Sequence, residues 1–157
     1  MKDRGMLLWH LGLGDHIICN GMVMEFLNEY REFLLPVKSG NISSVARMFS
    51  GLNIQTIEVN SDEEAEEEAM MLDYWGWDII RTGLFGRGFL KDTSNFALSF
   101  YEQVGIDFEC SWSSFRLPRD HQREGKLFDS LGSPMRYIFV HDDSSRDLCI
   151  REDLVRS

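Results

Sequence analysis

Residues 6–18 read MLLWHLGLGDHII: a short apolar run, two glycines with a leucine between them, two polar residues and then apolar residues again. The run at 6–11 has the length of a buried strand. From Ile17 to Tyr30 the apolar residues recur close to helical spacing. We therefore predict a strand, a glycine turn and a helix within the first thirty residues.

The alternation of strand and helix patterns continues to residue 104. We predict further strands at 33–38, 54–59 and 78–82, and further helices at 44–52, 63–72 and 96–104. Pro36 removes one hydrogen-bond donor from the second strand, which predicts an edge strand or a strand end at that residue. Strands and helices that alternate at these lengths favour an α/β domain, with a mostly parallel sheet and helices on both faces.

The pattern changes after this region. Residues 106–118 are irregular, 119–131 have the composition of a polar, exposed helix, and 136–141 have that of an apolar strand followed by a polar loop. We therefore divide the chain into a domain at 1–118, a linker with an exposed helix at 119–135, and the start of a second domain at 136–157.

Composition restricts the partners. The net charge of -10 over 157 residues argues against nucleic acid and against an anionic membrane surface. The three cysteines are far apart and form no CxxC pair, so we expect reduced thiols, no metal site and a cytoplasmic protein. No stretch approaches the ~20 apolar residues of a membrane-spanning helix.

The turn from Gly12 to His16 is the predicted ligand site. A turn between a strand and a helix lies at the carboxyl edge of a parallel sheet, where the helix N-terminus presents free N–H groups. Gly12 and Gly14 permit close approach of a ligand to the backbone. The third glycine of the dinucleotide fingerprint is missing, and so is a Walker-type Gly-Lys-Ser/Thr. The alternative is a tight turn that binds no ligand.

Asp15 and His16 are the candidates for acid–base chemistry at this turn. A carboxylate near a helix N-terminus stays ionised and suits a general base, and a histidine does the same near neutral pH. The alternatives are that Asp15 is a helix N-cap and that His16 is an exposed loop residue. The polar residues Lys38, Ser39 and Asn41 follow the second strand, where they either contact a substrate or form only a turn and a cap.

The run LWHLGLGDHIICNG, residues 8–21, resembles the opening of GT-B-type glycosyltransferases related to the ADP-heptose:lipopolysaccharide heptosyltransferases. The segments at 100–106 and 137–146 are similar to parts of glycosyltransferase-like sequences with the same opening. The resemblance implies two Rossmann-like three-layer domains with the active site between them, and no metal or other cofactor. It assigns a sugar or glycan acceptor to the N-terminal domain and the nucleotide-sugar donor to the C-terminal domain.

The resemblance makes Asp15 the base that deprotonates an acceptor hydroxyl, and the chemistry of the imidazole leaves His16 as the second candidate. It also places Ser144, Ser145 and Arg146 on the diphosphate of the donor. We therefore expect the acceptor-binding half of a glycosyltransferase, inactive until a companion domain or an oligomer partner completes it, because only the start of a donor domain is present. Two alternatives stay open: a non-catalytic α/β module for a small phosphorylated or sugar ligand, and a remnant that binds no ligand.

Overall fold

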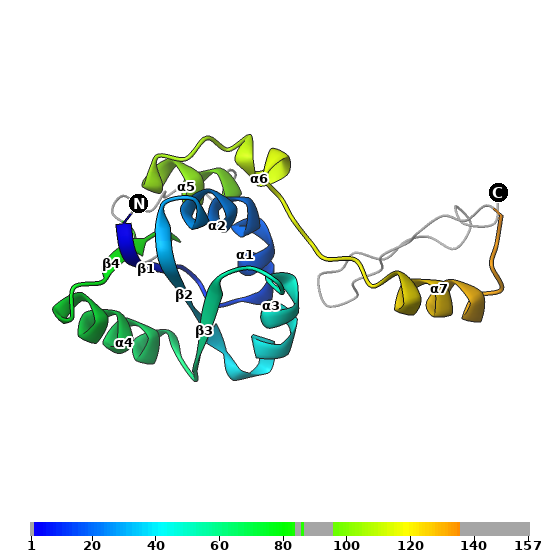
Figure 1. The fold of residues 1–157 in the computed structure, drawn as a ribbon, viewed down its shortest axis with the longest axis horizontal. Coiled ribbons are helices and arrows are strands. Elements are labelled where there is room, and N and C mark those ends of the chain that lie inside the picture. The colour runs from blue at the N-terminus through cyan, green and yellow to red at the C-terminus, as the bar shows by residue number, and fades with distance from the viewer. Residues whose placement is uncertain (1, 84–85, 87–95, 136–157) are drawn as a thin grey trace. The chain divides into compact units, whose positions relative to one another are not determined.

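The computed structural model describes residues 2–83, 86 and 96–135 (Figure 1). The chain divides into two compact units, Met1–Pro118 and Arg119–Ser157, and each is described by itself. The strand predicted at 136–141 and its following loop lie outside the described residues.

Four parallel strands form the sheet of the first unit, in the order β3-β2-β1-β4. They are β1 (Lys2–Leu8), β2 (Tyr30–Lys38), β3 (Ile54–Val59) and β4 (Asp78–Arg81). Gly5 of β1 pairs with Phe33 on one side and with Asp78 on the other. The predicted α/β class with a parallel sheet is therefore confirmed, and the arrangement is Rossmann-like.

Helices cover both faces of this sheet, which makes three layers (Figure 1). The first face carries α1 (Leu13–Ile18), α2 (Asn20–Leu27), α3 (Ile42–Met48), α5 (Phe96–Val104) and α6 (Cys110–Ser113). A short 3-10 turn, η1 (Ser39–Asn41), precedes α3. The second face carries α4 (Asp62–Tyr74). Each face of the sheet has its own apolar core: the first core lies on the face that carries α1, α2, α3, α5 and α6, and the second core lies on the face that carries α4. Leu7 belongs to the first core and its neighbours Met6 and Leu8 belong to the second, because successive side chains of a strand point to opposite faces.

The single helix predicted from Ile17 is wrong, because the structure has two shorter helices, of which only α1 starts before Ile17. α1 begins at Leu13 and ends at Ile18, and the next residue, Cys19, has a φ of -84° and a ψ of 4°, outside the helical region. Asn20 is fully buried, and its side-chain amide binds the backbone N–H and C=O of Arg116 at 2.8 and 2.9 Å. Packing against the 110–116 segment thus interrupts the periodic pattern.

Pro36 occupies an interior strand, so the prediction of an edge strand is wrong. The residue pairs with Ile57 of β3, but it lies beyond Leu34, the last β2 residue paired with β1. The missing donor is tolerated because this part of β2 has passed the end of its pairing with β1. The alternative prediction, a strand end, is also wrong, because β2 continues for two paired residues beyond Pro36 to Lys38.

The second unit is described from Arg119 to Met135 and contains α7 (His121–Ser130). The N-cap of this helix is Asp120, whose carboxylate accepts a hydrogen bond from the N–H of Arg123 at 3.0 Å. None of its residues is buried, as its polar composition predicts. Within the described residues, no helix combines the length and apolar character needed to cross a bilayer.

Candidate functional site

The polar residues predicted for a site gather at the carboxyl edge of the sheet. All four strands are parallel, so the residues that follow β1, β2, β3 and β4 lie at the same edge. The turn at Gly12 follows β1, and Lys38, Ser39 and Asn41 close β2. Both groups of residues therefore lie at one edge of the sheet.

Asp15 lies in the first turn of α1 rather than in a loop. Gly12 is the N-cap, so the alternative of Asp15 as the N-cap is wrong. The carboxylate of Asp15 folds back over Gly12, and a Cβ at Gly12 would lie 2.6 Å from Asp15 Oδ2. This geometry matches one half of a capping box, in which an acid three residues into the helix reaches the N-cap backbone; the other half is absent because Gly12 has no side chain. The absence of a side chain at Gly12 leaves room for the carboxylate of Asp15.

Burial raises the pKa of Asp15 above its usual value. His10 and the backbone N–H groups of Gly12 and Asp15 oppose this rise by favouring the ionised carboxylate, and the like charge of Asp62 adds to it. The residue is half-buried. A half-buried carboxylate with a raised pKa is a stronger proton acceptor than an exposed one.

His16 is fully buried inside the first core, with an exposed fraction of 0%. Its ring packs edge-on against Trp9 at a centroid distance of 5.1 Å. Neither ring nitrogen has a hydrogen-bond partner among the described residues, and burial lowers the pKa of His16 to about 4. The alternative of an exposed loop residue is therefore wrong. His16 supports α1 from within, while Asp15 lies toward the edge.

The residues that close β2 hold the edge together through their side chains. Lys38 Nζ lies 3.0 Å from Asp62 Oδ1, and Ser39 Oγ donates to Asn60 Oδ1 at 3.3 Å. Asn41 makes no side-chain cap of α3, and its amide instead donates to the carbonyl of Leu11 at 3.2 Å. Asn41 therefore fixes the backbone immediately before Gly12, and the prediction of a simple helix cap does not describe it.

Sequence reasoning missed three residues at this edge: His10, Asn60 and Asp62. His10 packs on the rings of Phe96 and Phe100, with centroid distances of 5.5 and 5.4 Å. Its electrostatic interaction with the carboxylate of Asp15 lowers the pKa of Asp15. Asn60 and Asp62 follow β3, so the rule that was applied to the end of β2 would have found them.

Ser61 is the N-cap of α4, and its hydroxyl accepts a hydrogen bond from the backbone N–H of Glu64 at 3.2 Å. Asp15 does not line either of two hollows on the described residues. One of about 360 Å³ runs along α4, and one of about 230 Å³ lies among Ile17, Phe108 and Trp112. In the part of the chain that is described, no group of three or more metal-ligating side chains is found. The donor residues predicted at Ser144, Ser145 and Arg146 lie outside the described residues.

No protein-family model matches this chain, and no curated protein or solved structure matches it significantly.

Proposed function

We propose that this chain is the acceptor-binding half of a GT-B-type glycosyltransferase in which Asp15 deprotonates the acceptor hydroxyl. The observation that carries the proposal is the half-buried Asp15 carboxylate, with its raised pKa, at the carboxyl edge of a Rossmann-like sheet. The resemblance of residues 8–21 to the opening of this enzyme group supports the same assignment.

The proposed reaction is an inverting transfer. The acceptor O–H gives its proton to the Asp15 carboxylate while its oxygen forms a bond to the anomeric carbon of the nucleotide sugar. On the opposite side of that carbon, the bond to the diphosphate oxygen breaks, and the nucleoside diphosphate leaves with the electron pair. Asp15 supplies the general base, and a facing donor domain would bind the nucleotide.

The electrostatics of the edge favour an uncharged hydroxyl ligand over a phosphate. The backbone N–H groups at the start of α1 already stabilise the carboxylate of Asp15. Lys38, which closes β2, is paired with Asp62. A phosphate would therefore meet the negative charge of Asp15 where a phosphate-binding turn presents free donors. This argues against the alternative of a phosphate-binding module.

The test is a titration of the ¹⁵N-labelled chain with methyl glycosides of hexoses and heptoses. We expect one of these glycosides to shift the amide resonances of Gly12, Asp15 and Asn41. Asp15→Asn should weaken that binding about tenfold or more, because a hydrogen bond to a charged acceptor is lost. Asp73→Asn, on the exposed face of α4, removes the same charge outside the site and should leave the affinity unchanged.

A second variant checks the geometry. Gly12→Ala places a methyl group against Asp15 Oδ2 and should displace the carboxylate, whereas a Cβ at Gly125 meets no atom within 4 Å. We expect Gly12→Ala to weaken glycoside binding and Gly125→Ala to leave it intact. If inorganic phosphate shifts these amides and no glycoside does, the phosphate-binding module is correct. If no ligand shifts them, the turn is structural and the proposal is wrong.

A further inference from the structure

The outward face of α4 carries one continuous stripe of exposed side chains. Glu63, Glu67, Met70, Met71 and Tyr74 recur at the spacing i, i+4, i+7, i+8 and i+11, which places them on one side of a helix. All five are exposed, Met70 by 63% and Tyr74 by 88%. The opposite side of the helix is buried on the sheet through two alanines, Ala65 and Ala69.

The two halves of this stripe differ in chemistry. The first half is acidic and the second is apolar, where Trp75 adds a further ring that is 62% exposed. A hollow of about 360 Å³ runs beside four acidic residues and Met70, and another of about 340 Å³ runs beside Met70, Met71, Tyr74 and Trp75. Met70 lines both hollows, so the acidic and apolar halves form one surface.

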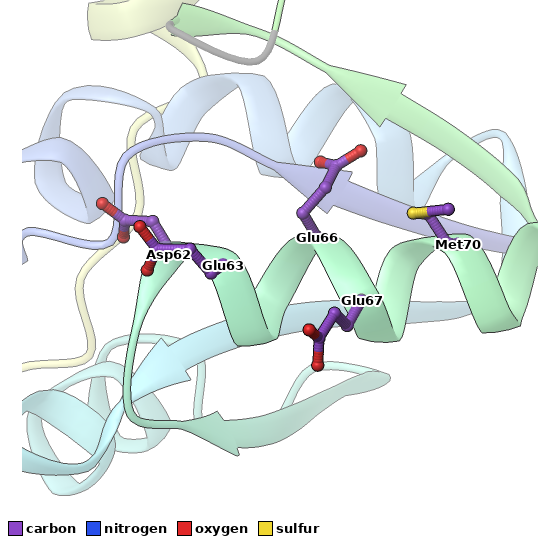
Figure 2. Close-up of a pocket in the computed structure, with 5 residues that line it drawn as sticks. All are labelled: Asp62, Glu63, Glu66, Glu67 and Met70. Atoms are coloured by element: carbon purple, nitrogen blue, oxygen red, sulfur yellow. The ribbon is translucent and has the colours of Figure 1, made fainter.

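Residues 62–74 contain seven acidic residues and no lysine or arginine. Two of the acids are already neutralised, Asp62 by Lys38 and Glu66 by Arg81 at 3.0 Å each. Figure 2 views this face of α4, with Glu66 and Met70 toward its edge near β4 and Glu67 toward its other edge. Among the described residues, no ion pair neutralises Glu63 or Glu67. The unpaired negative charge lies directly before the apolar half.

We propose that this surface, Glu63 to Trp75, binds a basic amphipathic helix of a partner protein. Methionine and aromatic side chains are common at the centres of interfaces, and methionine adapts to varied apolar anchors. Lysine or arginine side chains of the partner would meet Glu63 and Glu67, while its apolar side chains cover Met70 and Tyr74. At 1.5 Å per residue the surface is ~20 Å long, enough for about four turns of a partner helix.

The negative charge of α4 favours a basic partner helix over a second copy of this chain. Two parallel copies of α4 packed face to face would bring acidic residues together, antiparallel copies would place the acidic half of each over the apolar half of the other, and neither helix supplies a cation. Like charges in contact oppose association, whereas a basic partner gains favourable pairs. The occupant is therefore a different protein with a positively charged helix, and the surface is separate from the proposed role of Asp15.

The test uses the full chain and two labelled 14-residue helical peptides, followed by fluorescence anisotropy. One peptide has leucine at positions a and d of each heptad and lysine elsewhere, and the other replaces lysine by glutamate. We expect the leucine–lysine peptide to bind the chain. The double substitution Glu63→Lys with Glu67→Lys should weaken the affinity for the leucine–lysine peptide at least tenfold. The same variant should bind the leucine–glutamate peptide. Met70→Ala with Tyr74→Ala should also weaken the affinity for the leucine–lysine peptide at least tenfold.

The matched control is Glu29→Lys with Glu102→Lys, which changes the net charge equally at exposed positions outside α4. This control should bind the leucine–lysine peptide within twofold of the original chain, and circular dichroism should show that every variant is folded. The proposal is overturned if the control loses as much affinity as the α4 variant, if Met70→Ala with Tyr74→Ala has no effect, or if no peptide binds. A dimer in sedimentation that this apolar pair of substitutions abolishes would assign the surface to a second copy instead.

Discussion

His16 combines complete burial with two ring nitrogens that have no partner among the described residues. Burial lowers the pKa of this histidine to about 4, whereas the unfolded chain has the ordinary value of 6.5. As the pH falls below 6.5, the unfolded chain takes up a proton that the folded chain does not accept until near pH 4. The unfolded state is therefore favoured progressively between these two values.

We predict that His16 alone lowers the free energy of unfolding by about 2 kcal/mol between pH 7 and pH 5. Urea unfolding at the two pH values measures this difference, and His16→Leu should remove that part of it. The exposed His121 on α7 is the control, since His121→Leu leaves the buried ring in place. An NMR titration that gives His16 a pKa above 6 would contradict the prediction.

The sequence predicts that Asp15 lies at the carboxyl edge of the sheet, but it does not predict that His16 is buried. Gly-Asp-His after a strand indicates where polar groups gather, because the order of elements fixes the carboxyl edge. It does not indicate which side chains point inward, and the turn was treated as a loop although α1 begins at Leu13. In a helix, adjacent residues project about 100° apart, so Asp15 can lie toward the edge while His16 enters the core.

At the scale of the element, the contact of α2 with α6 depends on Gly21. A Cβ at this position would lie 1.9 Å from the carbonyl oxygen of Cys110 and 3.1 Å from the Cα of Ser111. Both atoms belong to backbone, so α6 as a whole must move to accept a methyl group. That movement would also strain the two hydrogen bonds between Asn20 and Arg116.

We predict that Gly21→Ala destabilises the chain by about 2 kcal/mol or more, the upper part of the range for overpacked cores. Thermal and urea unfolding measure the loss. Gly14→Ala is the matched control, since a Cβ there meets no atom within 4 Å and alanine favours a helix by up to ~1 kcal/mol. Equal stability of the two variants would show that α6 does not pack against α2 as described.

Elements with strong local patterns were predictable, and those set by distant contacts were not. The strand Ile54–Val59 has the predicted bounds because its alternation is local. β2 begins at Tyr30, three residues before the predicted start. The hydroxyl of Tyr30 bonds there with Asp78 at 2.5 Å and with Lys2 at 2.9 Å, a contact between three strands that no local pattern reveals. The break between α1 and α2 has the same origin in Asn20 and Gly21.

At the scale of the whole molecule, both apolar cores belong to the first unit. The buried residues of both clusters lie between Met6 and Tyr101, and the half-buried residues packed on them extend to Cys110. The last described contact of this unit with its interior is Arg116 on Asn20. α7, in the second unit, has no buried residue. Both cores of the described residues are complete before Pro118, so we predict that the first unit folds by itself.

We predict that a chain ending at Pro118 unfolds cooperatively, with a Tm within about 3 °C of the full chain, since less than 1 kcal/mol should be lost. A chain ending at Gly105 is the contrasting control, because it lacks Phe108, which packs on Tyr101 at a centroid distance of 5.4 Å, and Arg116. That shorter chain should melt far lower or without cooperativity in circular dichroism. If the chain ending at Pro118 behaves in the same way, residues after 118 stabilise the sheet, and Met1–Pro118 is not an independent folding unit.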